Sequence, residues 1–232
     1  MYKLLFMEKF KKIFEFILDY IYKKRCYFCG SNKECVKMCS KCYEQLQFSD
    51  LKPDRKILGV NVYTAGVYEK YLQKMIRGIK YHRQKDLAFY QAKFMWEYFS
   101  RLKETEHLED CYQVVPTPLH KSREKKRGYN QMKLVAEEFC ILSGYTLNNN
   151  LITRIKETKP QYKLSRKERL KNLDNAFEVN TKNLLNLPVL LLDDICTTGS
   201  TFESMIDKLN ENGINNITCL AASSPCQPGS AR

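Results

Sequence analysis

Two adjacent carboxylates, Asp193 and Asp194, precede a run of hydroxyl side chains in the stretch Val-Leu-Leu-Leu-Asp-Asp-Ile-Cys-Thr-Thr-Gly-Ser-Thr, residues 189–201. Four apolar residues in a row predict a strand that is buried on both faces. The hydroxyls around Gly199 and the helical pattern after Ser200 predict a loop that enters a helix, with Ser200 and Glu203 spaced as a capping box. Loop N–H groups and the positive end of a helix dipole together bind anions.

The carboxylates repel a phosphate, but they suit a neighbouring polyol or a magnesium ion. A sugar phosphate is therefore the ligand that this combination favours. A P-loop is excluded because no lysine precedes Ser200. A cysteine phosphatase would need an arginine where Phe202 stands. We therefore interpret Cys196 as a small loop residue and not as a nucleophile.

The stretch resembles the 5-phosphoribosyl-1-pyrophosphate (PRPP) signature of type I phosphoribosyltransferases. This resemblance implies an α/β fold, with a Rossmann-like parallel sheet and flanking helices. Asp193 and Asp194 would hold the ribose hydroxyls and magnesium. The 5-phosphate would lie in the loop formed by Cys196, Thr197, Thr198, Gly199, Ser200 and Thr201.

Composition restricts the partners and the compartment. The 232 residues include 39 Lys+Arg against 26 Asp+Glu, and this excess favours phosphorylated small molecules, nucleic acid or an anionic membrane surface. The sequence shows neither a signal peptide nor an apolar run of membrane-spanning length. We expect a cytoplasmic protein that reaches a membrane through partners, in which the ten cysteines are reduced and bind metal more readily than they form disulfides.

Two Cys-x-x-Cys pairs, Cys26/Cys29 and Cys39/Cys42, have the spacing of a tetrahedral four-cysteine zinc site. Four thiolates leave no position open for water, so the predicted zinc is structural. The segment has too little apolar content to fold alone, and metal binding would stabilise it. Cys35 lies between the pairs and could substitute for one of the ligands.

These patterns divide the chain into an amphipathic helix (1–25), a zinc-binding module (26–50), a phosphoribosyltransferase-type domain (56–223) and a tail (224–232). The first helix could lie on a membrane, but its charges favour packing on its own domain or on a partner. Within the main domain, periodicity predicts a strand or hairpin at 59–68, helices at 72–79 and 86–102, and strands at 112–115, 151–155, 175–179 and 216–222. Residues 120–127 read as a basic loop, and 161–172 as a basic loop or helix over the site.

The order of motifs is similar to that of the ComF family of bacterial competence proteins. The cysteine pairs are followed by Lys80-Tyr81, Val-Val-Pro-Thr-Pro-Leu-His at 114–120, Lys-Arg-Gly-Tyr-Asn-Gln at 126–131 and Leu164-Ser165-Arg166. The resemblance implies a role in natural transformation, with incoming single-stranded DNA, a helicase-like ATPase and a recombination-loading protein as partners. On the pyrophosphate or substrate side it implies Val115, Pro116, Thr117, Arg127, Asn130 and Gln131, with Lys80 and Arg166 as further phosphate or substrate contacts.

Three functions remain open from the sequence. The chain could bind PRPP with magnesium and, if it turns over, transfer the ribosyl 5-phosphate group as a pentosyltransferase. It could instead be a non-catalytic module that binds single-stranded DNA through basic loops and through Tyr27, Phe28 and Tyr129. Nucleotide salvage on the same fold is the third alternative.

Overall fold

The computed structural model describes residues 25–157 and 175–225. The helix predicted for 1–25, apart from Arg25, lies outside the described residues. So do the basic segment 161–172 with Arg166, and the tail from residue 226 onward. The chain divides into two compact units, Met1–Gln45 and Leu46–Arg232.

The described part of the first unit is built from turns and one short helix, α2 (Ser40–Tyr43). The amide of Gly30 donates to the carbonyl of Cys26, and the amide of Tyr27 donates to the carbonyl of Lys37, each at 2.8 Å. The Glu34 carboxylate accepts the N–H of Ser40 at 3.0 Å and its hydroxyl at 2.7 Å, which satisfies the exposed start of α2.

A six-stranded sheet in the order β1-β2-β8-β7-β3-β4 forms the centre of the second unit's described residues. Every neighbouring pair is parallel except β1 and β2, which form an antiparallel hairpin at one edge. The sheet strands are β1 (Arg55–Ile57), β2 (Val60–Val67), β3 (Gln113–Pro116), β4 (Thr146–Leu147), β7 (Val189–Ile195) and β8 (Ile217–Ser224). A separate antiparallel pair consists of β5 (Ile152–Arg154) and β6 (Phe177–Val179).

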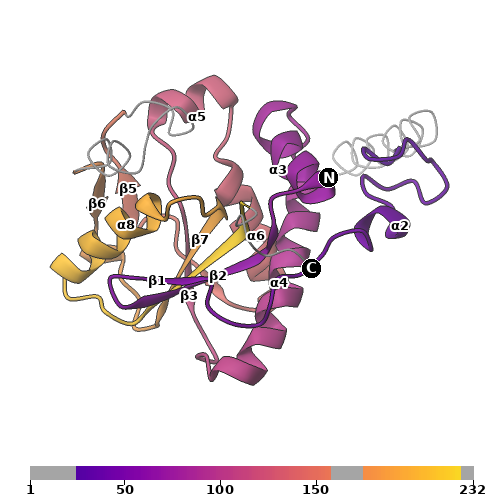
Figure 1. Ribbon diagram of the computed structural model, residues 1–232. Coiled ribbons are helices and arrows are strands. Elements are labelled where there is room, and N and C mark those ends of the chain that lie inside the picture. The colour runs from indigo at the N-terminus through magenta and orange to yellow at the C-terminus, as the bar shows by residue number, and fades with distance from the viewer. Residues whose placement is uncertain (1–24, 158–174, 226–232) are drawn as a thin grey trace, which may run out of the picture. The chain divides into compact units, whose positions relative to one another are not determined.

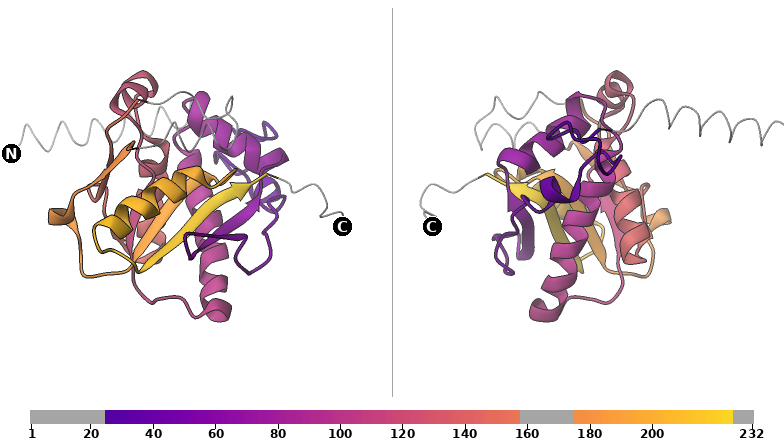
Figure 2. Two further views of the ribbon diagram at one scale, coloured as in Figure 1. Left: turned by 60° about the vertical axis from the view of Figure 1, so that its left-hand side comes forward. Right: turned by 90° about the vertical axis from the view of Figure 1, so that its right-hand side faces the viewer.

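Helices cover both faces of the sheet, which gives three layers (Figures 1 and 2). Helix α8 packs on one face in a core that includes residues of β5 and β6, whereas α4 contacts β2 and β8, and α6 contacts β3 and β7. The helices of this unit are α3 (Lys70–Tyr81), α4 (Leu87–Glu106), α5 (Lys121–Arg127), α6 (Gln131–Ser143) and α8 (Ser200–Glu211), with a 3-10 turn η2 (Thr181–Asn183). The predicted α/β fold with a mainly parallel sheet is confirmed, and it is consistent with a phosphoribosyltransferase-like fold.

Burial of β7 on both faces explains its unbroken apolar run. Val189 and Leu191 belong to the core beneath α8. Successive side chains of a strand point to opposite faces. Leu190 and Leu192, which are fully buried as well, therefore face the α4 and α6 side. The strand continues beyond its apolar residues, so both carboxylates of the 189–201 stretch belong to β7 itself.

The basic loop expected at 120–127 is a helix, α5, which corrects the sequence interpretation. The ring nitrogen Nδ1 of His120 accepts the N–H of Ser122 at 3.3 Å and caps the helix start. Gly128 ends the helix with φ +87°, a conformation that glycine adopts without steric cost. The lysines, arginines and glutamate between these caps have high helix propensity, which explains why the segment is helical.

The stretch before β1 follows the edge of the sheet. Phe48 forms a β-bridge with Gly66, and its ring stacks on Phe94 at 4.6 Å between centroids. The amide of Ser49 donates to the carbonyl of Ala65 at 2.9 Å. These contacts hold residues 48–49 against β2.

Candidate functional site

The two carboxylates of the 189–201 stretch leave β7 in opposite directions. Asp193 lines a hollow together with residues of the loop before α8. Asp194 instead accepts hydrogen bonds from residues of α3 and α6. The N–H of Asp194 donates to Oδ1 of Asp193 at 2.8 Å, so the backbone orients the first carboxylate. The alternation of a strand thus assigns different surroundings to two neighbouring acidic residues.

Two hydrogen bonds hold the first residues of the loop between β7 and α8. The N–H of Cys196 donates to the carbonyl of Ser223 at 2.8 Å, which extends the pairing with β8. Arg55 of β1 donates through Nη1 to the carbonyl of Thr197 at 2.9 Å. Gly199, with φ +82°, turns the chain into the helix. The loop is therefore shaped before any ligand arrives.

The capping box predicted for Ser200 and Glu203 is wrong, because Gly199 is the N-cap and Ser200 is already the first helical residue. The left-handed conformation of Gly199 brings the chain into the helix one residue earlier than expected. The Ser200 hydroxyl lies 2.8 Å from the hydroxyl of Thr198, and the Ser200 N–H donates to the same Thr198 oxygen at 3.4 Å.

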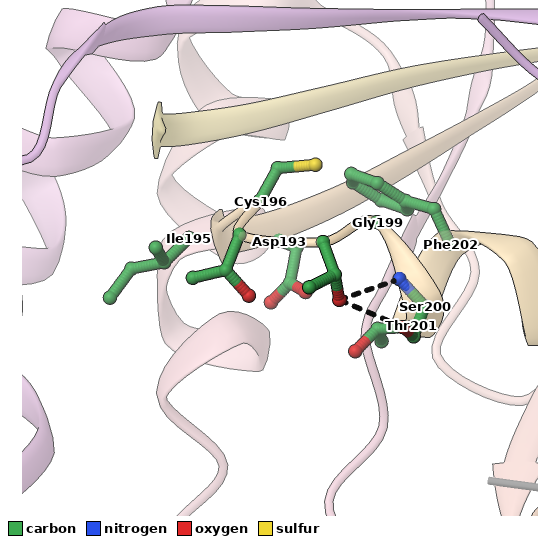
Figure 3. A pocket seen from close by; sticks show the side chains of 9 residues that line it. Asp193, Ile195, Cys196, Gly199, Ser200, Thr201 and Phe202 are labelled. Carbon is green, nitrogen blue, oxygen red and sulfur yellow. Dashed lines mark hydrogen bonds between the residues drawn. The ribbon is translucent and has the colours of Figure 1, made fainter. Parts of the chain in front are cut away.

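The hollow beside this loop contains all the residues that the sequence assigned to a 5-phosphate site (Figure 3). Its lining consists of Asp193, Ile195, Cys196, Thr197, Thr198, Gly199, Ser200, Thr201 and Phe202. The first N–H groups of α8 have no acceptor within the helix, and the helix dipole places partial positive charge at this end. Hydroxyls, N–H groups and the Asp193 carboxylate can therefore serve an anion and a polyol side by side.

The thiol of Cys196 is not suited to act as a nucleophile. Cys196 is 2% exposed and belongs to the core beneath α8, as does Phe202. Burial raises the pKa of the Cys196 thiol to about 12, so that it stays protonated at neutral pH. The structure thus agrees with the interpretation of Cys196 as a small buried loop residue.

The end of β3 and the start of α6 form a second wall. Thr117 donates its hydroxyl to the carbonyl of Leu192 at 2.9 Å. Asn130 donates through Nδ2 to the carbonyl of Thr117 at 3.2 Å, and its Oδ1 accepts the N–H of Met132 at 2.9 Å as the cap of α6. Asn130 therefore connects the helix start to the strand end.

A chain of polar contacts links the three predicted residues Lys80, Gln131 and Arg127 to Asp194. Lys80 at the end of α3 lies 2.7 Å from Oδ1 of Asp194, and Gln131 donates through Nε2 to Oδ2 at 3.0 Å. Arg127 donates to Oε1 of Gln131. Burial opposes the charge of Lys80, but the Asp194 carboxylate outweighs it and raises the pKa of Lys80 above its ordinary value. Lys80 therefore carries its positive charge at neutral pH.

Val115 and Pro116, two of the predicted site residues, lie in strand β3. The side chain of Val115 belongs to the core beneath α8, and Pro116 pairs with Leu192 in the parallel register. Arg166 lies outside the described residues, and its predicted role stays a prediction.

Arg154 is a residue near the site that the sequence interpretation missed. It ends β5, and its guanidinium lies over the Phe177 ring at 5.4 Å. Burial, followed by the positive charge of Arg123, lowers the pKa of Arg154 to about 10, and the charge of Asp193 partly offsets this shift. The sequence signal for Arg154 was a basic residue at the end of a predicted short strand. Such residues are common in sequences, so this signal alone does not indicate a site.

The surroundings of Asp193 raise the pKa of its carboxyl group. Burial, followed by the negative charge of Asp194, raises the pKa of Asp193. Lys80 and Arg154 act in the opposite direction, without cancelling the shift. An acidic residue with a strongly raised pKa in a hollow is a candidate for binding or catalysis.

The four predicted zinc ligands converge in the first unit. Their sulfur atoms all lie within 4.8 Å of one another, and those of Cys29 and Cys39 are 3.7 Å apart. Zinc–sulfur bonds of about 2.3 Å in a tetrahedron place the sulfurs about 3.8 Å apart, so the spacing fits the metal. Cys35 lies outside the cluster, and its thiol donates to the carbonyl of Asn32 at 3.3 Å. The four-cysteine cluster could therefore bind a structural zinc.

Among residues 25–157 and 175–225, no helix is both long and apolar enough to cross a membrane.

The described residues form an α/β protein with a mainly parallel sheet, consistent with a phosphoribosyltransferase-like fold, and an N-terminal four-cysteine cluster. Comparison with known proteins then gives its relatives. Over 195 residues it is 29% identical to Competence protein F of Haemophilus influenzae, covering 83% of this chain and 81% of that protein. It is 26% identical over 175 residues to DNA utilization protein YhgH of Salmonella typhimurium, covering 75% and 72%.

A third relative is Competence protein ComFC of Bacillus subtilis, 31% identical over 115 residues, which are 50% of this chain and 43% of that protein. No protein-family model matches the sequence. The resemblance to ComF competence proteins that the motifs predicted is confirmed by these homologues.

Proposed function

We propose that this chain acts in competence or DNA utilization, as the names of its relatives state for those proteins, through a site that binds a ribose 5-phosphate ligand such as PRPP. One observation supports the ligand class above the others. The hollow brings the carboxylate of Asp193, the hydroxyls of Thr198 and Ser200, and the start of α8 to one place.

In this proposal the phosphate and the sugar occupy different parts of the hollow. The phosphate accepts hydrogen bonds from the hydroxyls of the loop and from N–H groups in the first turn of α8, where the helix dipole stabilises negative charge. The ribose hydroxyls donate to Asp193, which is the carboxylate that lines the hollow. Asp194 acts indirectly, by holding Lys80 and Gln131.

If the chain turns over PRPP, the reaction is transfer of the ribosyl 5-phosphate group to an acceptor, with pyrophosphate as the leaving group. A transition state with oxocarbenium character needs positioned cations and hydrogen-bond donors near the leaving group, and no protein nucleophile. Lys80, Arg127 and Asn130 would supply those contacts. Magnesium would enter bound to the pyrophosphate oxygens of the ligand.

Zinc at the four-cysteine cluster is the second part of the proposal. The donor set is four sulfurs, which is the set of structural zinc sites. Closed coordination leaves no place for substrate, so the metal would stabilise residues 26–42 and take no part in the chemistry.

Calorimetric titration tests the ligand site. Ribose 5-phosphate and PRPP are each titrated into the wild type and into the double variant Asp193→Asn with Asp194→Asn, which keeps the shape of both side chains. Affinity should fall at least about tenfold, the equivalent of one lost charge-assisted hydrogen bond. Asp207→Asn, a change at an exposed residue of α8, is the matched control and should bind as the wild type does. Equal affinity in the double variant would refute the site.

A second candidate function, binding of single-stranded DNA, is favoured by helix α5. Lys121, Lys125 and Lys126 are all exposed on this short helix. Affinity for a single-stranded oligonucleotide should fall steeply with salt. Lys125→Gln with Lys126→Gln should reduce the slope of log affinity against log salt by about 1.4, because each lysine on a phosphate contributes about 0.7. An unchanged slope would exclude α5 from a DNA-binding surface. The helicase-like ATPase and the recombination-loading protein stay predictions.

A further inference from the structure

The ammonium group of Lys80 contacts Asp194, one of the two carboxylates that the sequence assigned to magnesium. Lys80 Nζ lies 2.7 Å from Oδ1 of Asp194, and the two side chains are only 17% and 6% exposed. Gln131 Nε2 donates to the other carboxylate oxygen, Oδ2, at 3.0 Å. Donors from α3 and α6 thus engage both oxygens of Asp194.

Two cations already act on the carboxylate pair. The positive charges of Lys80 and Arg154 both act on Asp193, and Lys80 also forms an ion pair with Asp194. Magnesium prefers an octahedron of oxygens and usually keeps several of its waters. At Asp194 it would meet an ammonium group, which repels it, and both carboxylate oxygens of this buried residue already accept hydrogen bonds. The residues present therefore do not fit a magnesium ion at Asp194.

We propose that Lys80 is the permanent counter-ion of this carboxylate pair, so that the pair binds its ligand through hydrogen bonds and holds no divalent metal of its own. Asp194 is then a positioning residue: it fixes Lys80 at the end of α3 and Gln131 at the start of α6. Asp193 alone presents its carboxylate to the hollow. The inference deepens the proposed ribose 5-phosphate site, but its main test requires no sugar ligand.

Manganese(II) alone is the probe, because its free ion gives an electron paramagnetic resonance signal that disappears on binding. Four proteins are titrated: wild type, Asp193→Asn, Lys80→Ala, and Lys80→Ala with Asp194→Asn. Wild type and Asp193→Asn should bind equally weakly. Removal of the ammonium should create a site at Asp194 that binds manganese at least about tenfold more tightly, and the added Asp194→Asn change should abolish it. Lys125→Ala, at an exposed lysine of α5, should behave as wild type.

Saturable manganese binding by the wild type that Asp193→Asn removes would overturn the proposal. Lys80→Ala leaves a buried carboxylate without its partner and could fail to fold, in which case the comparison of wild type with Asp193→Asn still decides. Lys80→Arg keeps the charge and should resemble the wild type.

A second measurement separates this inference from the proposed function. The affinity of wild type for ribose 5-phosphate should be the same within about twofold with magnesium as with a chelator. An affinity that depends on magnesium contradicts the counter-ion role. Absence of ribose 5-phosphate binding under both conditions would refute the proposed function, whereas the manganese pattern would continue to test Lys80 by itself.

Discussion

A Cβ atom on Gly199 would lie 2.4 Å from Cδ1 of Ile57, a distance that non-bonded atoms do not tolerate. Gly199 also has φ +82°, which costs a residue with a side chain about 1–2 kcal/mol. The β1–β2 hairpin therefore packs directly on the loop that precedes α8. The positive φ favours glycine at residue 199, and a side chain there would also displace the end of the Ile57 side chain.

Gly199→Ala should reduce the free energy of unfolding by about 2–4 kcal/mol, the sum of backbone strain and overpacking, and should weaken ribose 5-phosphate binding. Gly213→Ala is the matched control, because Gly213 also has positive φ but no atom lies within 4 Å of the added Cβ. It should lose only the backbone part and keep its affinity. Urea denaturation and calorimetry measure both quantities. Equal losses in the two variants would contradict the contact with Ile57.

Asp193→Asn should stabilise the ligand-free protein at neutral pH. Burial and then Asp194 raise the pKa of Asp193 from 3.8 to about 7, so the folded chain holds a proton that the unfolded chain releases. The free energy of unfolding of wild type therefore falls as pH rises from about 4 to about 7. Asparagine carries no charge and still accepts the Asp194 N–H.

The gain in this variant should be on the order of 1–3 kcal/mol at pH 7 and should vanish near pH 4. Thermal unfolding across this pH range, with Asp207→Asn as the control at an exposed carboxylate, measures the difference. A variant less stable than the wild type at pH 7 would show that Asp193 is stabilised by its cations and not strained by burial.

Zinc content should depend on Cys39 and not on Cys35. The sulfur of Cys39 lies in the four-cysteine cluster, whereas Cys35 is exposed and outside it. Purified wild type and Cys35→Ser should each contain one zinc per chain by elemental analysis, and Cys39→Ser should contain far less. Loss of zinc in Cys35→Ser would assign the fourth ligand to that residue.

Asn130→Ala should cost about 1–2 kcal/mol of stability, because it removes the cap of α6 together with the link to the Thr117 carbonyl. Asn130→Asp is the informative partner variant. Aspartate retains the acceptor that caps α6, but it places a carboxylate oxygen, which cannot donate, beside the carbonyl of Thr117. Asn130→Asp should therefore be more stable than Asn130→Ala but less stable than the wild type. Full recovery, measured by urea denaturation, would show that the bond to Thr117 contributes nothing.

Local patterns in the sequence were enough to predict the strand of residues 189–192, the helix after Gly199 and the four-cysteine cluster. Each depends on spacing within one strand, one turn or two short knuckles, and such spacing is encoded directly by neighbouring residues. The same reasoning failed for α5, where a run of basic residues suggested a loop. The caps at His120 and Gly128 show that helix propensity prevails in that segment.

The sequence by itself therefore determined the chemical types at the site: two carboxylates, a hydroxyl-rich loop and a helix start. Only the tertiary structure decided which of them act together. Lys80 meets Asp194 across 114 residues, and Arg55 meets Thr197 across 142. Such pairs depend on strand order and on crossovers of the whole sheet, which no local period specifies. Because side chains alternate along β7, Asp193 lines the hollow whereas Asp194 contacts Lys80. The sequence Asp-Asp alone does not distinguish these two roles.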